Sequence, residues 1–138
     1  MMDLISPRLL AALDDLGIDL IFEKMNRRGF YWPELNAIVM NEDILKSNDV
    51  NFGIAHELSH AIKKHNNINS LYNSSFVSHS KIEFEADLSA IKMLIDIYID
   101  ETGMDFDQLN SSKFMEYYGI ESRLYDTVTE TLRTYRYA

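Results

Sequence analysis

The sequence predicts an α+β fold, in which a small twisted antiparallel sheet near the N-terminus packs on a mainly helical core. Short β-branched and aromatic segments occur before residue 42, whereas the chain beyond it carries apolar residues at helical spacing. The chain has 138 residues, 46% of them hydrophobic, and shows no internal repeat or linker that would divide it. We therefore expect residues 1–138 to form a single domain.

The first predicted element is an amphipathic helix. Ser6 and Pro7 favour its start, because serine caps a helix N-terminus and proline suits the first turn. Leucines then recur at helical spacing, at positions 9, 10, 13 and 16, and Gly17 is expected to end the helix.

Three short strands are expected next. Ile18–Glu23 alternates in part between apolar and polar residues, and the aromatic segment Phe30–Trp32 suits a second strand. Ala37–Asn41 gives the clearest strand pattern, because it is short and β-branched. We expect Tyr31 and Trp32 to pack in the core, and the alternative is that they help to hold a partner.

The rest of the chain is expected to form helices and loops. Helices are predicted over Val50–His65 and Lys81–Glu101, separated by an Asn- and Ser-rich loop at Asn66–Ser78. A short helix at Ser112–Tyr118 follows, and a last helix begins at about Glu121. The last helix carries an apolar stripe formed by Leu124, Val128, Leu132 and Tyr135.

Composition excludes several classes of protein and restricts the kind of metal site. The chain has no cysteine, which excludes disulfide scaffolds and cysteine nucleophiles, so histidine and carboxylate must hold any metal. The formal net charge of −9 disfavours direct nucleic-acid binding, because such a protein repels phosphate backbones. Neither a secretory signal nor a membrane-spanning apolar stretch is apparent, which predicts a cytoplasmic protein that does not contact a membrane.

The most informative segment is residues 56–60, HELSH, an HExxH motif within a predicted helix. His56 and His60, at positions i and i+4, project from one helix face, so both imidazoles can reach one metal ion. Glu57 lies beside them and can serve as the base for an activated water molecule. Gly53 falls on the same face and leaves space there. The alternative is an exposed face of His and Glu residues without a metal.

A catalytic zinc ion takes a third protein ligand and leaves one position open for water. Glu83 is the predicted third ligand, because it lies on the inward face of its helix, where a buried carboxylate needs a partner. His79 is the second choice, and an ordinary acid near a helix N-terminus is the alternative for Glu83. His65 projects among apolar residues and Glu85 lies on a hydrophilic face, so packing and solvent exposure are the better interpretations for these two.

Asp87 shares the inward face with Glu83, one helical turn later, and Phe84 is placed on this face as well. A carboxylate at this position can accept the second N–H of a ligating histidine and fix its tautomer. We predict this supporting role for Asp87, and a structural pair with a lysine or arginine is the alternative.

Two motifs together resemble the ImmA/IrrE family of metallopeptidases, whose pattern is HExxH followed by ExxA and then Asp or Asn. Here HELSH is followed, after 22 residues, by EFEAD at Glu83–Asp87. The strand that ends at Asn41 and the segment Phe52–Ala55 that leads into HELSH are also similar to that family. The resemblance covers residues 15–100 and extends more loosely to Arg123–Leu124.

The resemblance implies a gluzincin-like, Zn²⁺-dependent endopeptidase of phages, mobile elements or bacteria. Its zincin-like core would combine the HExxH helix with a second long helix that carries the glutamate ligand. His56, His60 and Glu83 would be zinc ligands, and Glu57 would be the catalytic acid and base. Members act on, or with, a helix-turn-helix repressor and relieve repression, so a transcriptional repressor is the implied protein substrate or partner.

Hydrolysis also needs a donor to the developing oxyanion and a place for the substrate backbone. Tyr72 and His79 are candidates for the donor or for substrate contact, with loop packing as the alternative. The substrate is expected to add as a strand to Ile38–Asn41. A competing hypothesis is a metal-containing module that docks on a partner without cleaving it. Glu57 favours the enzyme, since a purely structural site does not need this residue.

Overall fold

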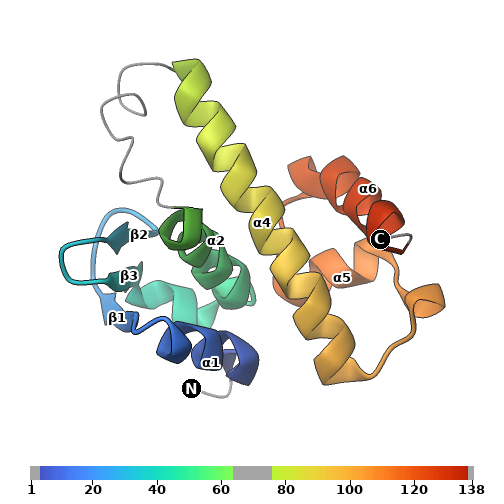
Figure 1. Ribbon diagram of the computed structural model, residues 1–138, viewed down its shortest axis with the longest axis horizontal. Coiled ribbons are helices and arrows are strands. Elements are labelled where there is room, and N and C mark those ends of the chain that lie inside the picture. Colours follow the sequence, from blue (N-terminus) through green and yellow to red (C-terminus); the bar gives the residue numbers. More distant parts are fainter. Residues whose placement is uncertain (1–3, 64–75, 137–138) are drawn as a thin grey trace.

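The computed structural model of the protein describes residues 4–63 and 76–136. Figure 1 shows the sheet on one side, α2 beside it, α4 across the middle, and α5 and α6 beyond α4. In chain order the elements are α1 (Pro7–Asp15), β1 (Asp19–Glu23), β2 (Gly29–Trp32), β3 (Ala37–Asn41), η2 (Glu42–Lys46), α2 (Val50–Lys63), α4 (Phe76–Thr102), η4 (Phe106–Gln108), α5 (Ser111–Tyr118), η5 (Ser122–Leu124) and α6 (Tyr125–Arg136). The predicted α+β class is confirmed.

Helix α1 begins and ends where the sequence indicates. The Ser6 hydroxyl accepts a hydrogen bond from the Leu9 backbone N–H at 3.4 Å, and Pro7 occupies the first turn. Gly17 follows the helix with a φ of +67°, a left-handed conformation that glycine adopts without steric cost. Leu9 and Leu13 are buried, so the predicted apolar face packs on the core.

Strand β3 is the centre of a mixed sheet with the strand order β1-β3-β2. Strand β2 pairs with β3 in antiparallel orientation, whereas β1 pairs with β3 in parallel, Leu20 facing Ile38. The prediction of a wholly antiparallel sheet is therefore wrong. Because residues 37–40 are all buried, β3 takes the centre, and the consecutive strands β1 and β2 become the two edges.

Helix α2 contacts both the sheet and α4. Gly53 permits the close approach to the sheet, because a Cβ at this position would lie 2.7 Å from Ile44 Cδ1 and 3.0 Å from Met40 Cε. Part of the space predicted beside Gly53 is thus filled by these two side chains. The opposite, apolar face of α2 is buried at Ile54 and Leu58, as its helical spacing predicts.

Helix α4 begins at Phe76, before its predicted start at Lys81. The prediction of a loop at residues 76–78 is wrong, because composition favoured a loop while residues 76–80 contain no glycine or proline to prevent a helix. The other residues of that predicted loop lie outside the described residues, as does the end of the helix predicted to reach His65.

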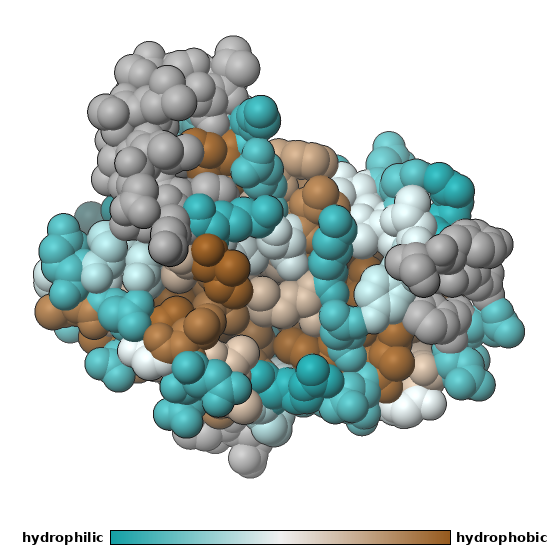
Figure 2. All heavy atoms as spheres, viewed as in Figure 1, coloured by the Kyte–Doolittle hydropathy of each residue, from teal (hydrophilic) through white to brown (hydrophobic). Residues whose placement is uncertain are grey.

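Some apolar side chains predicted to face inward are exposed. Phe84 is 49% exposed and Trp32 43%, whereas Tyr31 packs partly buried against the core. The spacing of residues in a helix or strand gives the direction of a side chain but not whether a neighbouring element covers it. Figure 2 shows the result on one face, where hydrophobic residues reach the surface in patches separated by hydrophilic ones.

The C-terminal helices α5 and α6 pack on each other, and α6 also packs on α4. Gly119 ends α5 in a left-handed conformation with a φ of +62°. The predicted stripe of α6 and the turn before it is confirmed, since Leu124 and Val128 are buried and Leu132 and Tyr135 are partly buried against the core. Within the described residues, no helix combines the length and the apolar composition that a membrane span needs.

Candidate metal centre

Three potential ligand atoms converge between α2 and α4. His60 Nε2 lies 2.9 Å from Glu83 Oε2, His56 Nε2 lies 3.1 Å from the same oxygen, and the two Nε2 atoms are 3.2 Å apart. Ligand atoms on a tetrahedral ion at bond lengths of about 2.0–2.1 Å are separated by about 3.3 Å. The cluster of His56, His60 and Glu83 is therefore compatible with a bound metal ion.

Helical spacing and helix packing produce this convergence. His56 and His60 are one turn apart on α2, and their ring centroids are 4.8 Å apart. His60 meets Glu83, whereas His56 meets both Glu83 and Asp87, so α4 runs antiparallel to α2. Ala86, between the two acids, is fully buried, and its small side chain suits a close approach of the two helices.

Asp87 supports the first histidine from the side away from the ligand atoms. Its Oδ1 lies 2.9 Å from His56 Nδ1, and its side chain is only 7% exposed. A carboxylate there accepts the Nδ1 proton, so Nε2 is the nitrogen of His56 that faces Glu83 and the space between the potential ligand atoms. Asp87 thus lies where the predicted supporting role requires it.

Arg123 is a residue of the site for which the sequence predicted no role, although the family resemblance extends loosely to Arg123–Leu124. Its Nη2 lies 3.4 Å from Asp87 Oδ2, and its Nε donates to Glu121 Oε2 at 2.7 Å. Both interpretations considered for Asp87 therefore coexist, since one carboxylate contacts a histidine and an arginine. The sequence signals were this loose resemblance and an arginine beside the apolar Leu124. The contact itself was concealed, because Arg123 and Asp87 are 36 positions apart in the chain.

Charge and burial shift the pKa values of the cluster in the metal-free protein. Burial alone would lower the pKa of His56, but hydrogen bonds with Asp87 and Glu83 and the charge of Glu57 outweigh it and raise the pKa to about 10. Burial would raise the pKa of Glu83, but hydrogen bonds from His56 and His60 hold it well below its usual value. These shifts favour a protonated His56 in the metal-free cluster at neutral pH, and metal binding would release that proton.

Glu57 lies beside the ligands without joining them. Burial raises the pKa of its carboxyl, and Glu83 raises it further, whereas His56, His60 and Arg27 lower it. An acid with a raised pKa exchanges protons more readily near neutral pH.

A cleft of about 390 Å³ opens on the cluster. Its walls come from the loop before β2, from α2, from α4 and from the segment before α6. The lining residues are Arg27, Arg28, Gly29, Phe52, Gly53, His56, Glu57, Glu83, Asp87, Glu121 and Arg123. Basic and acidic side chains therefore both line the cleft, although the protein as a whole is acidic.

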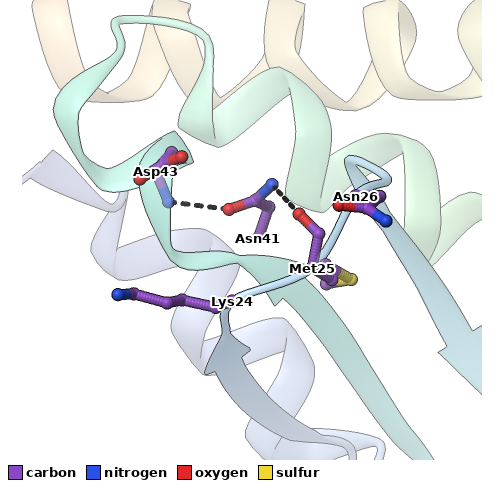
Figure 3. Close-up of a pocket in the computed structure, with 5 residues that line it drawn as sticks. All are labelled: Lys24, Met25, Asn26, Asn41 and Asp43. Atoms are coloured by element: carbon purple, nitrogen blue, oxygen red, sulfur yellow. Dashed lines mark hydrogen bonds between the residues drawn. The ribbon is translucent and has the colours of Figure 1, made fainter.

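The loop that carries Arg27 and Arg28 is held by Asn41, the last residue of β3. The Asn41 side-chain amide donates to the carbonyl oxygens of Met25 at 2.8 Å and Arg27 at 3.2 Å, and its oxygen accepts the Asp43 N–H at 3.0 Å. Figure 3 shows the bonds to Met25 and Asp43 at an open, polar pocket on this loop. A polar residue at the end of an apolar strand was the sequence signal for this role.

The remaining predicted residues lie apart from the ligand atoms or outside the described residues. His79 lies in α4 and Glu85 is partly buried there, and neither belongs to the cluster of ligand atoms. Tyr72 and His65 lie outside the described residues. The prediction that a substrate adds to Ile38–Asn41 is wrong, because β3 is paired on both sides.

An HExxH helix packed against a second helix that supplies a glutamate defines a site of the metallopeptidase type. The comparison with protein families agrees: residues 13–121 match the model of the peptidase M78 family, described as the IrrE N-terminal-like domain, and the chain belongs to this family. The resemblance to the ImmA/IrrE family is thereby confirmed. No curated protein and no solved structure matches the chain significantly.

Proposed function

We propose that the protein is a zinc-dependent endopeptidase that hydrolyses a peptide bond in a protein partner. The observation that carries the proposal is the convergence of His56, His60 and Glu83 in a cleft that also contains Glu57. The peptidase M78 family supports the same kind of activity. Zinc is the proposed metal, because two imidazoles and one carboxylate leave a fourth tetrahedral position for water, as catalytic zinc sites require.

Glu57 is the proposed general acid and base. Zinc, when bound, would polarise the scissile carbonyl and lower the pKa of a water molecule. Glu57 would accept a proton from the attacking water and then deliver it to the leaving amine. The raised pKa of Glu57 supports the second half of this cycle, because its carboxyl group holds a proton more firmly than an exposed one.

The edge of β2 that faces away from β3, with which no other strand pairs within the described residues, is the proposed place for the substrate backbone. The Arg28 carbonyl oxygen accepts a hydrogen bond from the Asn41 N–H at 2.8 Å, so the alternating pattern turns the backbone groups of Gly29 and Tyr31 away from β3. Gly29 also lines the cleft, so a peptide added as a strand at this edge would run beside Glu57.

A transcriptional repressor of the helix-turn-helix type is the proposed protein partner, on the strength of the family resemblance. Its cleavage would relieve repression. The net charge of −9 supports a protein rather than a nucleic acid as the molecule bound directly.

Co-expression with a repressor encoded beside this protein tests the proposal. The wild type is expected to bind zinc and to yield a cleavage product. His60→Ala is expected to lose zinc and activity, and Glu57→Gln to keep zinc and lose activity alone. Equal zinc in the wild type and His60→Ala would contradict the metal site. Relief of repression by Glu57→Gln without any cleavage product would favour the docking module over the enzyme.

A further inference from the structure

We propose that Arg123 is a positioning residue of the metal centre, which acts on His56 through the carboxylate of Asp87. The inference rests on the metal binding of the proposed function but does not depend on peptide hydrolysis. It links η5, which lies outside both ligand helices, to a ligand that α2 carries.

The contacts form a continuous chain from the cleft rim to the ligand. Arg123 Nη2 lies 3.4 Å from Asp87 Oδ2, and Asp87 Oδ1 lies 2.9 Å from His56 Nδ1. The two carboxylate oxygens of Asp87 are thus divided between one cation and one imidazole. Since a carboxylate is planar, a contact on Oδ2 restricts its rotation and keeps Oδ1 directed at the imidazole.

Burial makes this division of partners necessary. The Asp87 side chain is only 7% exposed, so an oxygen without a partner would cost free energy that water cannot restore. Negative charge also accumulates here, because Glu57 and Glu83 line the same cleft. The guanidinium of Arg123 offsets this charge from the rim, where its side chain remains 59% exposed.

The backbone of Arg123 is anchored although its side chain is exposed. Ile120 and Leu124 on either side are buried at 7% and 3% exposure. The Nε of Arg123 donates to Glu121 Oε2 at 2.7 Å, which leaves Nη2 directed at Asp87. An anchored backbone and a side chain held at a second point are what a positioning role requires.

Arg123→Gln tests the inference, with Arg8→Gln as the matched control. Arg8 Nη1 also pairs with an aspartate of α4, Asp100, at 3.2 Å, and its side chain is 49% exposed, but neither residue lines the cleft. The measurement is the zinc dissociation constant of the full chain, by competition with a chelator. The thermal midpoint of the metal-free protein reports whether each variant folds.

Loss of a residue that orients a metal-bound histidine typically weakens metal affinity about 10–100-fold. Asp87→Asn is expected to weaken zinc affinity within that range. Arg123→Gln is expected to weaken it about three- to tenfold, because Arg123 is one contact further from the metal. Arg8→Gln is expected to leave zinc affinity unchanged. Arg123→Lys should retain part of the affinity, because its ammonium keeps the charge without the planar fork.

A double-mutant cycle separates positioning from a general electrostatic effect. If Arg123 acts through Asp87, Arg123→Gln will have no further effect on zinc affinity in the Asp87→Asn background. An undiminished effect in that background, or an unchanged affinity in Arg123→Gln alone, would overturn the inference. Absence of zinc binding by the wild type would instead refute the proposed function itself.

Discussion

The two halves of α4 differ in what they present to the rest of the molecule. The first half directs Glu83 and Asp87 at the histidines of α2. The second half directs Leu94 and Tyr98 into the hydrophobic core. There the Tyr98 ring packs edge-on against the Phe114 ring, with the ring centroids 5.5 Å apart. One rigid helix therefore carries both the metal centre and the packing that holds it in place.

This division indicates which half stabilises the fold. Buried apolar and aromatic side chains contribute favourable free energy as they leave water. The ion pairs between the carboxylates of the first half and His56 are opposed by desolvation, and their contribution to stability depends on pH. We therefore expect changes in the first half to impair metal binding and changes in the second half to impair stability.

The largest expected effect is on metal binding, from Glu83→Gln. A ligand is lost, so zinc affinity should fall by more than the roughly 100-fold upper range for residues that only orient ligands. The metal-free protein should remain folded, since the Glu83 side chain is 35% exposed and lies outside the hydrophobic core. Zinc content by mass spectrometry and the thermal midpoint check both halves of the prediction. Stoichiometric zinc in this variant would contradict the assignment of Glu83.

The next largest effect is expected on stability, from Phe114→Ala. Phe114 is fully buried against Tyr98, and truncation of such a side chain typically costs about 3–5 kcal/mol of unfolding free energy. Urea denaturation of the metal-free protein measures the loss. Tyr117→Ala is the matched control. The Tyr117 ring also packs against the Tyr98 ring, with centroids 5.1 Å apart, but Tyr117 is 54% exposed, so its truncation should lower the unfolding free energy far less. Equal losses of unfolding free energy in the two variants would show that burial does not determine how much each side chain contributes to stability.

The two halves also differ in how far the sequence predicts them. HELSH and EFEAD identified the residues of the candidate metal centre, because helical spacing alone puts His56 beside His60 and Glu83 beside Asp87. The fold class and most boundaries of helices and strands could be predicted from the spacing of apolar residues and from helix caps such as Ser6 and Gly119. These features depend on residues that are close in the sequence.

Features that depend on distant residues were missed. The parallel pairing of β1 with β3 follows from the burial of β3 on both faces, which strand periodicity does not reveal. The contact of Arg123 with Asp87 joins residues 36 positions apart. Phe84 is exposed because no neighbouring element of the described structure covers its side chain fully. Each requires the tertiary arrangement, which local pattern does not contain.

An intermediate effect is expected from pH, which acts on His56 of α2 and its contacts with the first half of α4. The pKa of His56 rises from 6.5 to about 10 on folding of the metal-free protein, so protonated His56 stabilises the fold. The contribution is complete below about pH 6.5 and disappears as pH rises toward 10, at a cost on the order of a few kcal/mol.

Urea denaturation with a chelator at pH 6, 8 and 10 measures this loss. His56→Gln should flatten the profile between pH 6.5 and 10. Saturating zinc should reverse the trend for the wild type, because the metal displaces the proton and binds more tightly as pH rises. A wild-type profile that stays flat without metal would contradict the coupling of His56 to Asp87 and Glu83.

The smallest effect is expected from Asn41→Ala, which loosens the cleft wall opposite α4. The Asn41 amide holds the carbonyl oxygens of Met25 and Arg27, and bonds of this kind typically contribute about 0.5–1.5 kcal/mol each. The loop contains two exposed arginines, so trypsin should cleave after Arg27 or Arg28 faster in the variant.

Asn51→Ala is the matched control for this prediction. The Asn51 side chain also bonds two backbone groups, the Ser6 N–H at 2.8 Å and the Leu4 carbonyl at 2.9 Å, but neither residue lines the cleft. It should lower global stability by a similar amount without accelerating tryptic cleavage at the loop. If both variants are cleaved there at the same increased rate, global unfolding rather than the loop explains the effect. If only Asn41→Ala is cleaved faster, the wall of the cleft depends on its contact with the end of β3.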